Sequence, residues 1–555
     1  VSPKSVGTLF NWAIGISMAL IWEPLTPVSF RVPIMVTSFN SVFSERDKLY
    51  ISTYLGDDVI YSNIREGYQD NNSSITEDRM KMGWNWGNLI TAARWNHVVN
   101  NKLFMDASAT YTRYRFDMNV GMSQKHTGKN STSYSYASET LGYQSGIQDY
   151  AAKVDFDYSP NPNNDIKFGA SYTNHTFRPG VERFKENYEN DSTKVVNDTI
   201  IGNQNMLAHE TALYFEDNVS IGQVLKANFG LHYSTFYVQG RFYQSPQPRA
   251  SMRALLSDNL SVKAGYAMMT QYIHLLSNSN ISLPTDLWVP ATKKVTPMRS
   301  HQYSVGVFYN LNNLVDFSVE SYYKSMHNLI EYKPGASFMN SNTGWEQKVY
   351  SGEGWSYGVE FLAQKSVGKT TGWVGYTWSK SERRFNRPGQ EINDGLVFPA
   401  KFDRRHDVSI VVSHKFSEKI DASATWVYST GNCGTLGLQN YSSYPIDGSF
   451  IDFNNLANQF FYPATSVPYI EKRNNYRLPD YHRLDLSVNF HKQLKHGVRT
   501  WNISVYNAYN QMNPFLVYLK TNYSYSETGL SQTWKSLNKL TLFPIIPSVS
   551  YSYKF

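Results

Sequence analysis

The chain has 555 residues, of which 15% are aromatic and only 17% are charged, whereas soluble domains carry about a quarter charged residues. Its mean hydropathy of −0.45 excludes a helical membrane protein, and its single cysteine, Cys433, excludes an internal disulfide and a multi-cysteine metal cluster. The net charge of +7 is spread along the chain. It gives no basic run that would bind nucleic acid, and it is compatible with anionic partners such as lipopolysaccharide.

The N-terminal segment, residues 1–31, does not show the alternation of a strand. Its stretch 10–22 is mostly apolar, but it is too short for a spanning helix, which needs about 20 apolar residues. No positive cluster precedes this stretch and no small-residue cleavage site follows it, so we expect it in the mature chain. Two interpretations stay open for residues 1–31: the first strands of a barrel, or poorly assigned sequence.

From about residue 32 to 555, apolar and polar residues alternate in successive stretches. In 223–233, the odd-numbered residues from Leu225 to Tyr233 are apolar or aromatic, and those between them are polar or glycine. The same period of two recurs in 166–173, 420–428 and 484–490. A period of two over about ten residues is typical of a tilted transmembrane strand with one face toward lipid. The sequence therefore predicts an all-β, antiparallel transmembrane β-barrel over 32–555.

Turn-forming residues separate these stretches at two kinds of spacing. Short turns fall at 45–47, 100–102, 160–164, 220–222, 257–259, 310–313, 367–369, 417–419 and 494–497. Longer loops rich in Asn, Ser and Gly fall at 121–147, 178–207 and 431–480. Outer-membrane barrels have short periplasmic turns and long extracellular loops, so we assign the two sets accordingly. Nine turns that each join two strands, together with a final strand, predict about nineteen strands.

The last strand ends on an aromatic residue. Val549, Tyr551, Tyr553 and Phe555 alternate with polar residues, which predicts one face for lipid and one for water. A terminal strand of this kind resembles that of a bacterial outer-membrane barrel, which the insertion machinery reads. A soluble sandwich that happens to end on a strand is the alternative.

Few residues suggest covalent chemistry. His406 and Asp407 follow Arg404 and Arg405 at the start of a strand. They could form an acid/base pair, but we interpret them as an ion-pair cluster that fixes a strand end near the outer loops, and we interpret 481–485 in the same way. No histidine spacing indicates a metal site, and there is no nucleophile elbow or phosphate-binding loop. We predict no catalytic, cofactor-binding or metal-binding residues.

Two further groups of residues are candidate ligand contacts. Lys153, Asp155 and Asp157 share one strand face, where they would either solvate a water-filled lumen or bind a ligand. Four loop aromatics could stack on sugars or peptide side chains, or could belong to an interface girdle: Trp345, Tyr350, Trp355 and Tyr444. Neither group defines a binding site from sequence alone.

Several strings, in order along the chain, resemble one family, the TonB-dependent outer-membrane transporters of Bacteroidetes. These strings lie at 246–251, 269–276, 286–290, 402–408, 476–485 and 505–515, followed by the closing strand. The resemblance covers about residue 35 to 555. It implies a barrel of about 22 strands with a plugged lumen, whereas about nineteen can be counted here.

The resemblance implies TonB-dependent active import of a nutrient across the bacterial outer membrane. The family's plug domain and TonB-contacting segment are absent from this sequence, so we expect the chain to be the barrel portion of a longer protein rather than a barrel that lost its plug. Implied partners are outer-membrane lipid and lipopolysaccharide, the TonB complex through the plug, and a surface lipoprotein lid. Alternatives are a passive porin, a membrane-embedded hydrolase and a structural barrel of a surface complex. Glycan, peptide, siderophore and cobalamin all remain open as substrates.

Overall fold

A computed structural model describes most of the chain. The described residues are 17–22, 26–31, 34–69, 74–128, 134–202, 205–277, 286–336, 344–437, 439–443, 465–525, 531–541 and 543–554. Their backbone is almost wholly extended, with two short 3-10 segments, Trp345–Lys348 (η2) and Asn393–Gly395 (η3). Within these ranges, no helix has the length and apolar character needed to cross a membrane.

Residue contacts divide the chain into two compact units. Unit 1 comprises residues 1–278, 285–305 and 326–351, and unit 2 comprises 279–284, 306–325 and 352–555. Three strands contribute residues to both units: β16 (Met298–Leu311), β17 (Val315–Tyr332) and β18 (Val349–Lys365).

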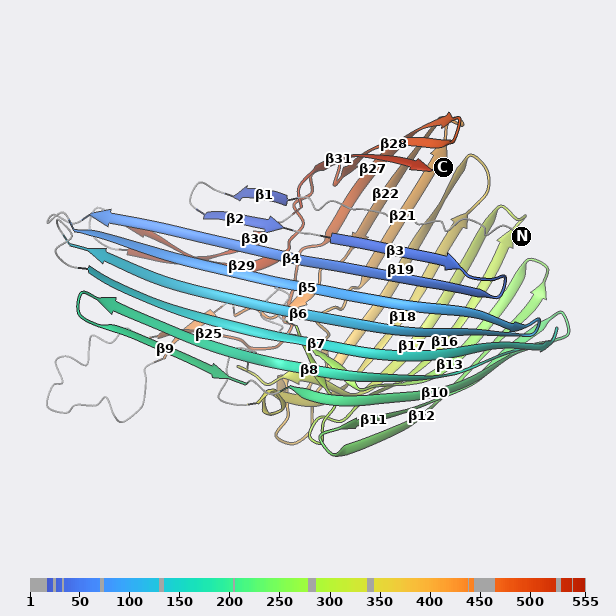
Figure 1. The fold of residues 1–555 in the computed structure, drawn as a ribbon, viewed down its shortest axis with the longest axis horizontal. Helices are drawn as coiled ribbons and strands as arrows, with labels where there is room; N and C mark the ends of the chain where they lie inside the picture. Colours follow the sequence, from blue (N-terminus) through green and yellow to red (C-terminus); the bar gives the residue numbers. More distant parts are fainter. Residues whose placement is uncertain are drawn as a thin grey trace. The chain divides into compact units, whose positions relative to one another are not determined.

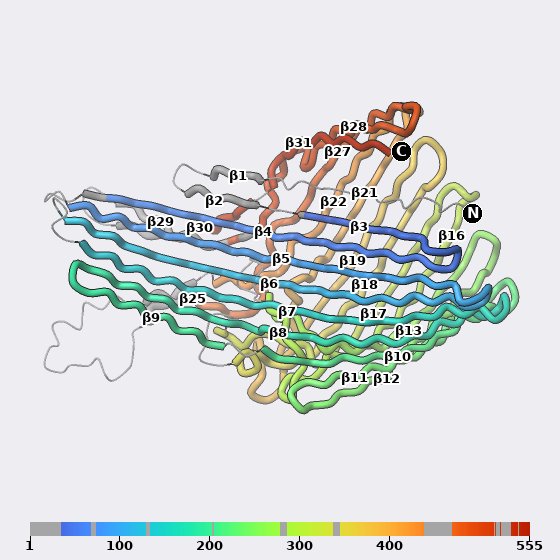
Figure 2. Tube along the Cα trace, viewed as in Figure 1, coloured from blue at the N-terminus to red at the C-terminus, as the bar shows by residue number. Residues whose placement is uncertain are grey.

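Unit 1 is an antiparallel meander (Figures 1 and 2). Its strands are β1 (Ser17–Trp22), β2 (Thr26–Arg31), β3 (Ile34–Val42), β4 (Asp47–Gln69), β5 (Ile75–Asn100), β6 (Leu103–Thr127), β7 (Tyr134–Asn161), β8 (Asn164–Asn190), β9 (Lys194–Ile201), β10 (Met206–Ile221), β11 (Leu225–Val238), β12 (Arg241–Ser257), β13 (Leu260–Gln271), β14 (Ile273–Leu276) and β15 (Leu287–Pro290). Each strand from β3 to β8 and from β10 to β13 pairs antiparallel with the next. One edge of β8 pairs with β10 near its start and with β9 near its end.

Unit 2 repeats the antiparallel pattern. Its strands are β18 (Val349–Lys365), β19 (Thr370–Arg384), β20 (Phe398–Pro399), β21 (His406–Lys415), β22 (Ile420–Ser429), β23 (Cys433–Gly434), β24 (Gln439–Ser443), β25 (Thr465–Tyr469), β26 (Tyr476–Arg477), β27 (Tyr481–Leu494), β28 (Gly497–Tyr506), β29 (Leu516–Tyr525), β30 (Ser531–Leu540) and β31 (Ile546–Lys554). The long strands pair in the order β18, β19, β21, β22, β27, β28 and β31. The remaining pairings are β19 with β20, β23 with β26, β24 with β25, and β29 with β30.

All nine short turns predicted from the sequence join consecutive strands. Examples are the turns between β7 and β8, between β10 and β11, and between β27 and β28. Asn312, Asn313 and Gly222 adopt the positive φ that such turns require. Within the described residues, the prediction of an all-β, antiparallel fold is confirmed. The strands predicted on either side of each of the nine turns are also present.

Two of the three predicted long loops are wrong over most of their length. Residues 121–147 continue β6 and β7, and residues 178–207 continue β8 and form β9. The strands from β4 to β8 are 23 to 28 residues long, whereas about ten residues cross a bilayer. The part of a strand that extends beyond the membrane needs no apolar face. Its sequence therefore loses the alternation of apolar and polar residues, although its backbone hydrogen bonds to the neighbouring strands remain. The third predicted loop, 431–480, holds β23 to β26, and its part 444–464 lies outside the described residues.

The N-terminal segment forms strands where it is described. β1 pairs with β2. β3 and β2 both pair with one edge of β4: β3 pairs with its first part, residues 48–56, and β2 pairs with residues 59–62. The choice between the two interpretations of residues 1–31 stays a prediction.

One face of the unit 1 sheet is apolar and exposed. Phe215 and Phe229 are 52% and 60% exposed, and Phe215 lies opposite Leu231 across β10 and β11. Tyr111 and Tyr150 lie opposite each other across β6 and β7 on this face, with ring centroids 5.1 Å apart. Tyrosine rows of this kind mark the membrane–water interface of outer-membrane barrels. Because Phe229 and Leu231 are exposed on this apolar face, the alternation predicted for 223–233 is confirmed.

Candidate functional site

The opposite face of unit 1, here called the covered face, has a segment of chain packed against it. This covering segment comprises the described residues 272–277 and 286–292, which include β14 and β15. A buried apolar cluster joins Tyr272 and Ala291 of the covering segment to residues of β8, β10 and β11: Phe177, Met206, Ala208, Phe236 and Val238. β15 also contacts β7 and β8. The covering segment thus lies across four neighbouring strands.

Tyr272 fixes one end of the covering segment. Its ring stacks on Phe236 with centroids 4.8 Å apart, and its hydroxyl lies 2.8 Å from Ser234 Oγ. Gln247 Nε2 donates to the same Ser234 oxygen over 2.7 Å. At the other end, Tyr243 Oη donates to the carbonyl oxygen of Thr292 over 2.7 Å. Buried hydrogen bonds of this kind fix position because an unpaired partner would be costly.

His274 of β14 is the most buried titratable group of the covering segment. Its side chain is fully enclosed, and β14 pairs only with β15 among the described strands. Burial lowers the pKa of His274 to about 4, although a hydrogen bond with the backbone of Thr296 opposes this shift. The imidazole is therefore neutral at physiological pH.

The covered face also carries paired charges. His175 of β8 is buried between two carboxylates, with Nδ1 at 2.8 Å from Asp149 Oδ1 and Nε2 at 3.5 Å from Glu210 Oε2. Lys153 and Asp155, which the sequence placed on one face, form an ion pair over 2.8 Å. On this face of the sheet, His175 is thus paired with Asp149, and Lys153 with Asp155.

The remaining residue of the predicted inward set is also paired. Asp157 Oδ1 lies 3.5 Å from Lys167 Nζ on the neighbouring strand β8. Tyr214 Oη donates to Asp155 Oδ1 over 2.5 Å. The three charged positions therefore belong to a cross-strand polar network.

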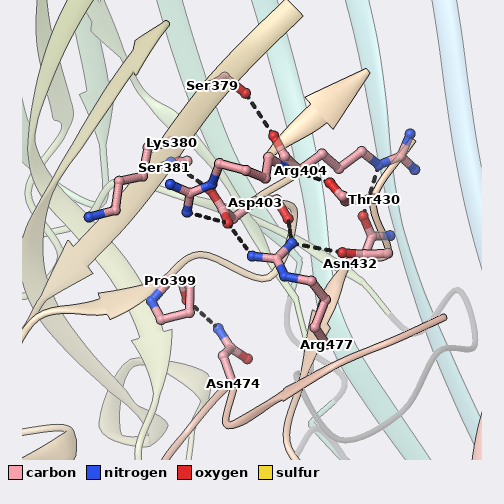
Figure 3. A network of polar contacts seen from close by, with 12 residues as sticks. Ser379, Lys380, Ser381, Pro399, Asp403, Arg404, Thr430, Asn432, Asn474 and Arg477 are labelled. Carbon is pink, nitrogen blue, oxygen red and sulfur yellow. Dashed lines mark hydrogen bonds and ion pairs between the residues drawn. The ribbon is translucent and has the colours of Figure 1, made fainter. Parts of the chain in front are cut away.

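In unit 2, Asp403 organises the loops that join the strands (Figure 3). Its side chain is completely buried and accepts hydrogen bonds from the backbone N–H of Ser381 over 2.7 Å and from Arg477 Nη2 over 2.5 Å. Arg405 Nη2 lies 3.4 Å from the same carboxylate. Arg477 Nη1 also donates to the carbonyl oxygens of Asp403 and Gly431 over 2.7 and 2.8 Å. The pair of Asp403 and Arg477 thus connects β19, the 400–405 turn, β26 and the loop after β22.

The same network extends to other loop residues. Arg404 Nε donates to Asn432 Oδ1 over 3.0 Å, and Asn474 Nδ2 donates to the Pro399 carbonyl over 2.9 Å (Figure 3). Asp480 accepts from Tyr428 Oη over 2.7 Å. Within the predicted 404–407 cluster, Arg404 Nη1 lies 3.9 Å from Asp407 Oδ2, and Arg405 pairs with Asp403. The role of this cluster in fixing a strand end near the outer loops stays a prediction.

Neither histidine-containing motif forms an acid/base pair. His406 Nδ1 lies 2.9 Å from Tyr376 Oη, and Asp407 lies 3.9 Å from Arg404 Nη1. His482 Nδ1 lies 2.9 Å from Tyr509 Oη, and Arg483 pairs with Asp485 over 2.9 Å. These side chains hold strand ends.

The loop aromatics lie against cations or within the fold. Trp345 is buried, Tyr350 has Lys333 Nζ 5.2 Å from its ring centroid, and Trp355 has the Arg384 guanidinium at 5.3 Å. Tyr444 lies outside the described residues. Each of the described three has its own neighbours within the fold.

The closing strand β31 pairs with β28, and its residues Val549, Tyr551 and Tyr553 are exposed. Tyr551 packs edge-on against Trp501 with centroids 5.0 Å apart. Phe555 lies outside the described residues. The role of these residues in membrane insertion stays a prediction.

Cys433 is buried beside the Asp403 network, and burial raises the pKa of its thiol. In the part of the chain that the structure describes, no three His, Cys, Asp or Glu side chains are grouped to hold a metal ion.

Comparison with known proteins gives the family. The family described as "TonB dependent receptor-like, beta-barrel" matches residues 36–510. The chain belongs to this family. TonB-dependent receptors are outer-membrane transporters and receptors rather than enzymes, so the chain is an outer-membrane β-barrel protein that acts with TonB in transport. No curated protein sequence matches the chain.

Solved TonB-dependent receptor structures share the fold at low identity. The ferric-catecholate import receptor Fiu from K12 E. coli is 10% identical, covers 98% of this chain and 82% of its own, and gives a TM-score of 0.53. BauA, the ferric preacinetobactin receptor of Acinetobacter baumannii, is 11% identical, with coverages of 95% and 78% and a TM-score of 0.51. The ferripyoverdine receptor of Pseudomonas aeruginosa is 11% identical, with coverages of 95% and 70% and a TM-score of 0.50.

The sequence predicts part of the covering segment of this receptor, but not the contacts that hold the segment against the covered face. The strings 269–276 and 286–290 were recognised as family motifs, and they supply most of the covering segment. Nothing in them indicated that Tyr272 would stack on Phe236. Ser234 and Gln247 were missed because each reads as an ordinary polar position on an alternating strand.

Proposed function

We propose that this TonB-dependent receptor actively imports a nutrient. The observation that carries the proposal is the covering segment, which crosses four strands of the covered face and is fixed at Tyr272 and Thr292. If the covered face lines the barrel lumen, this segment narrows it. A narrowed lumen with paired wall charges suits a selective, energised transporter better than an open diffusion pore.

In this mechanism the chain performs no covalent chemistry. Its loops in unit 2, held by Asp403 and Arg477, would present a rigid rim for the nutrient. TonB would pull a plug domain and open a path along the covered face. A surface lipoprotein lid of the kind known for the Bacteroidetes type would capture the nutrient first.

Uptake in cells tests the proposal. Cells that lack the protein would be compared with complemented cells, in backgrounds with and without TonB, using labelled ferric siderophores, cobalamin, oligosaccharides and peptides as probes. We expect at least one probe to enter only when both the protein and TonB are present. Uptake through the protein that persists without TonB, with ion conductance in planar bilayers, would instead establish a passive porin.

The mechanism also requires a plug, and this can be tested separately. The intact mass of the protein extracted from native outer membranes should lie well above the 63.6 kDa of this chain. Co-purification from the same membranes tests the lipoprotein lid. A native mass of 63.6 kDa would contradict the TonB-pulled plug.

A further inference from the structure

The covered face continues onto the long ends of β4 to β8, where it carries two pairs of opposed carboxylates. Glu66 of β4 lies directly opposite Asp78 of β5. Glu139 of β7 lies directly opposite Glu186 of β8. Like charges placed directly opposite across an antiparallel pair destabilise it. Two such pairs within one sheet face therefore represent a cost that the fold itself does not explain.

An apolar patch separates the two carboxylate pairs. Ile64, Met80 and Met122 lie side by side across β4, β5 and β6, and Met122 lies opposite Glu139. Met122 is 55% exposed, and the three side chains line a hollow of about 540 Å³ together with Glu66, Asp78 and Glu139. Arg79 also lines this hollow, and its Nε donates to Asn63 Oδ1 over 2.8 Å. Exposed methionine is typical of adaptable binding surfaces.

These carboxylates have few partners. Among the residues that the structure describes, no Lys, Arg or His makes an ion pair with any of the four. Asp78 accepts one hydrogen bond, from Gln124 Nε2 over 2.9 Å. Glu186 accepts one from Asn197 Nδ2 over 3.4 Å. Lys153 and Asp155, also on the covered face, form an ion pair over 2.8 Å, whereas none of these four carboxylates has a cation of the described residues at such a distance.

We propose that this acidic surface, formed by the four carboxylates and the three apolar residues, docks a basic segment of a partner polypeptide. The two carboxylate pairs are three strand spacings apart, which is about 14 Å. In an extended segment, residues four apart lie about 13 Å from each other and on the same side, with the residue midway also on that side. Two cations with an apolar residue between them therefore match the surface.

The openness of the surface favours a polypeptide over a small molecule. Small-molecule sites bury most of the ligand surface, whereas Glu66, Glu139 and Glu186 are exposed here. The strands also project well past the length that a bilayer requires, which leaves this face accessible to a protein partner. The inference does not depend on which nutrient is transported.

The test uses the full chain in detergent and a labelled peptide with lysines at its ends, leucine in the middle and serine between them. We expect saturable binding that weakens with salt. The double variants Glu66→Gln/Asp78→Asn and Glu139→Gln/Glu186→Gln should each weaken binding by about tenfold or more, because each removes a charged hydrogen-bond partner. Glu77→Gln is the matched control, since residue 77 neighbours Asp78 on β5 but lies on the opposite face.

Several outcomes would overturn the proposal. One is equal binding by the double variants and the Glu77→Gln control. Another is equal binding of a peptide with glutamates at its ends to the unmodified protein, a measurement that does not depend on any variant folding. Saturable binding of Ca²⁺ that both double variants abolish, without peptide binding, would replace the polypeptide by a cation.

Discussion

Arg477 places one guanidinium nitrogen 2.5 Å from the buried Oδ2 of Asp403, 74 residues earlier in the chain. Asp403 has no exposed surface, whereas a third of the Arg477 side chain is exposed. The pair therefore joins two loops of unit 2 at a point where one partner is shielded from water and the other is reached by it. Its geometry is that of a charge-assisted hydrogen bond.

Replacing Asp403 by alanine should loosen the loops of unit 2. The change leaves the Ser381 N–H and the Arg477 guanidinium without their acceptor. A buried ion pair that loses one partner costs about 3–5 kcal/mol, and the partial exposure of Arg477 reduces the expected cost to about 1–3 kcal/mol. Thermal unfolding and protease cleavage within 399–405 and 430–436 measure it. Asp407→Asn, whose carboxylate is half exposed and 3.9 Å from Arg404, is the control and should change little.

His274 should make the protein less stable in acid. Burial holds its pKa at about 4 in the fold, against about 6.5 in the unfolded chain. Above pH 6.5 the group is neutral in both states and contributes nothing. As the pH falls from about 6.5 to about 4 the unfolded state takes up a proton that the fold excludes, so stability falls by about 3 kcal/mol.

The variant His274→Leu isolates this effect. It should have a melting temperature that depends less on pH between 4 and 7 than that of the unmodified protein. Equal pH dependence of the two proteins would mean that His274 does not govern acid stability.

The sequence predicted the turns well because turn chemistry is local. Asn312 and Asn313 form their tight turn with positive φ whatever the strands beyond them do, and the alternation of Leu225 to Tyr233 reports a lipid-facing strand directly. The prediction failed at 121–147 because neither face of that part of the hairpin β6–β7 keeps an unbroken row of apolar residues: Met122 and Leu141 share their face with Gln124 and Glu139. Only the ladder hydrogen bonds therefore reveal these strands.

The candidate site depended on register and on long-range pairing, which composition does not encode. Glu66 faces Asp78 only because the β4–β5 ladder runs in register to its far end. Shifting the ladder by one residue would place the two carboxylates on opposite faces. Likewise, the family string that contains Asp403 and the string that contains Arg477 were both recognised, but their contact could not be predicted.

Tyr272 should control the covering segment. Tyr272→Phe keeps the stack on Phe236 and removes the hydrogen bond to Ser234, which should cost about 1 kcal/mol. Tyr272→Ala removes both and should cost about 3–5 kcal/mol in local stability. Hydrogen exchange of the segment around β14 and β15 measures the difference. Similar protection in both variants would show that the stack does not hold the segment.

The closing strand should tolerate charge on only one face. Tyr551 is 54% exposed and packs against Trp501 on the apolar side of β31, so Tyr551→Lys places a cation toward lipid at a cost of about 2–4 kcal/mol near the bilayer midplane. Ser550 lies on the other face, opposite Asn502, so Ser550→Lys is the matched control. The fraction of protein that reaches a heat-modifiable, folded state in the outer membrane measures insertion. We expect a marked loss for Tyr551→Lys and little for Ser550→Lys, because only the first charge must enter hydrocarbon. Equal insertion of both variants would contradict a lipid-facing Tyr551 and, with it, the role assigned to the alternating residues of the terminal strand.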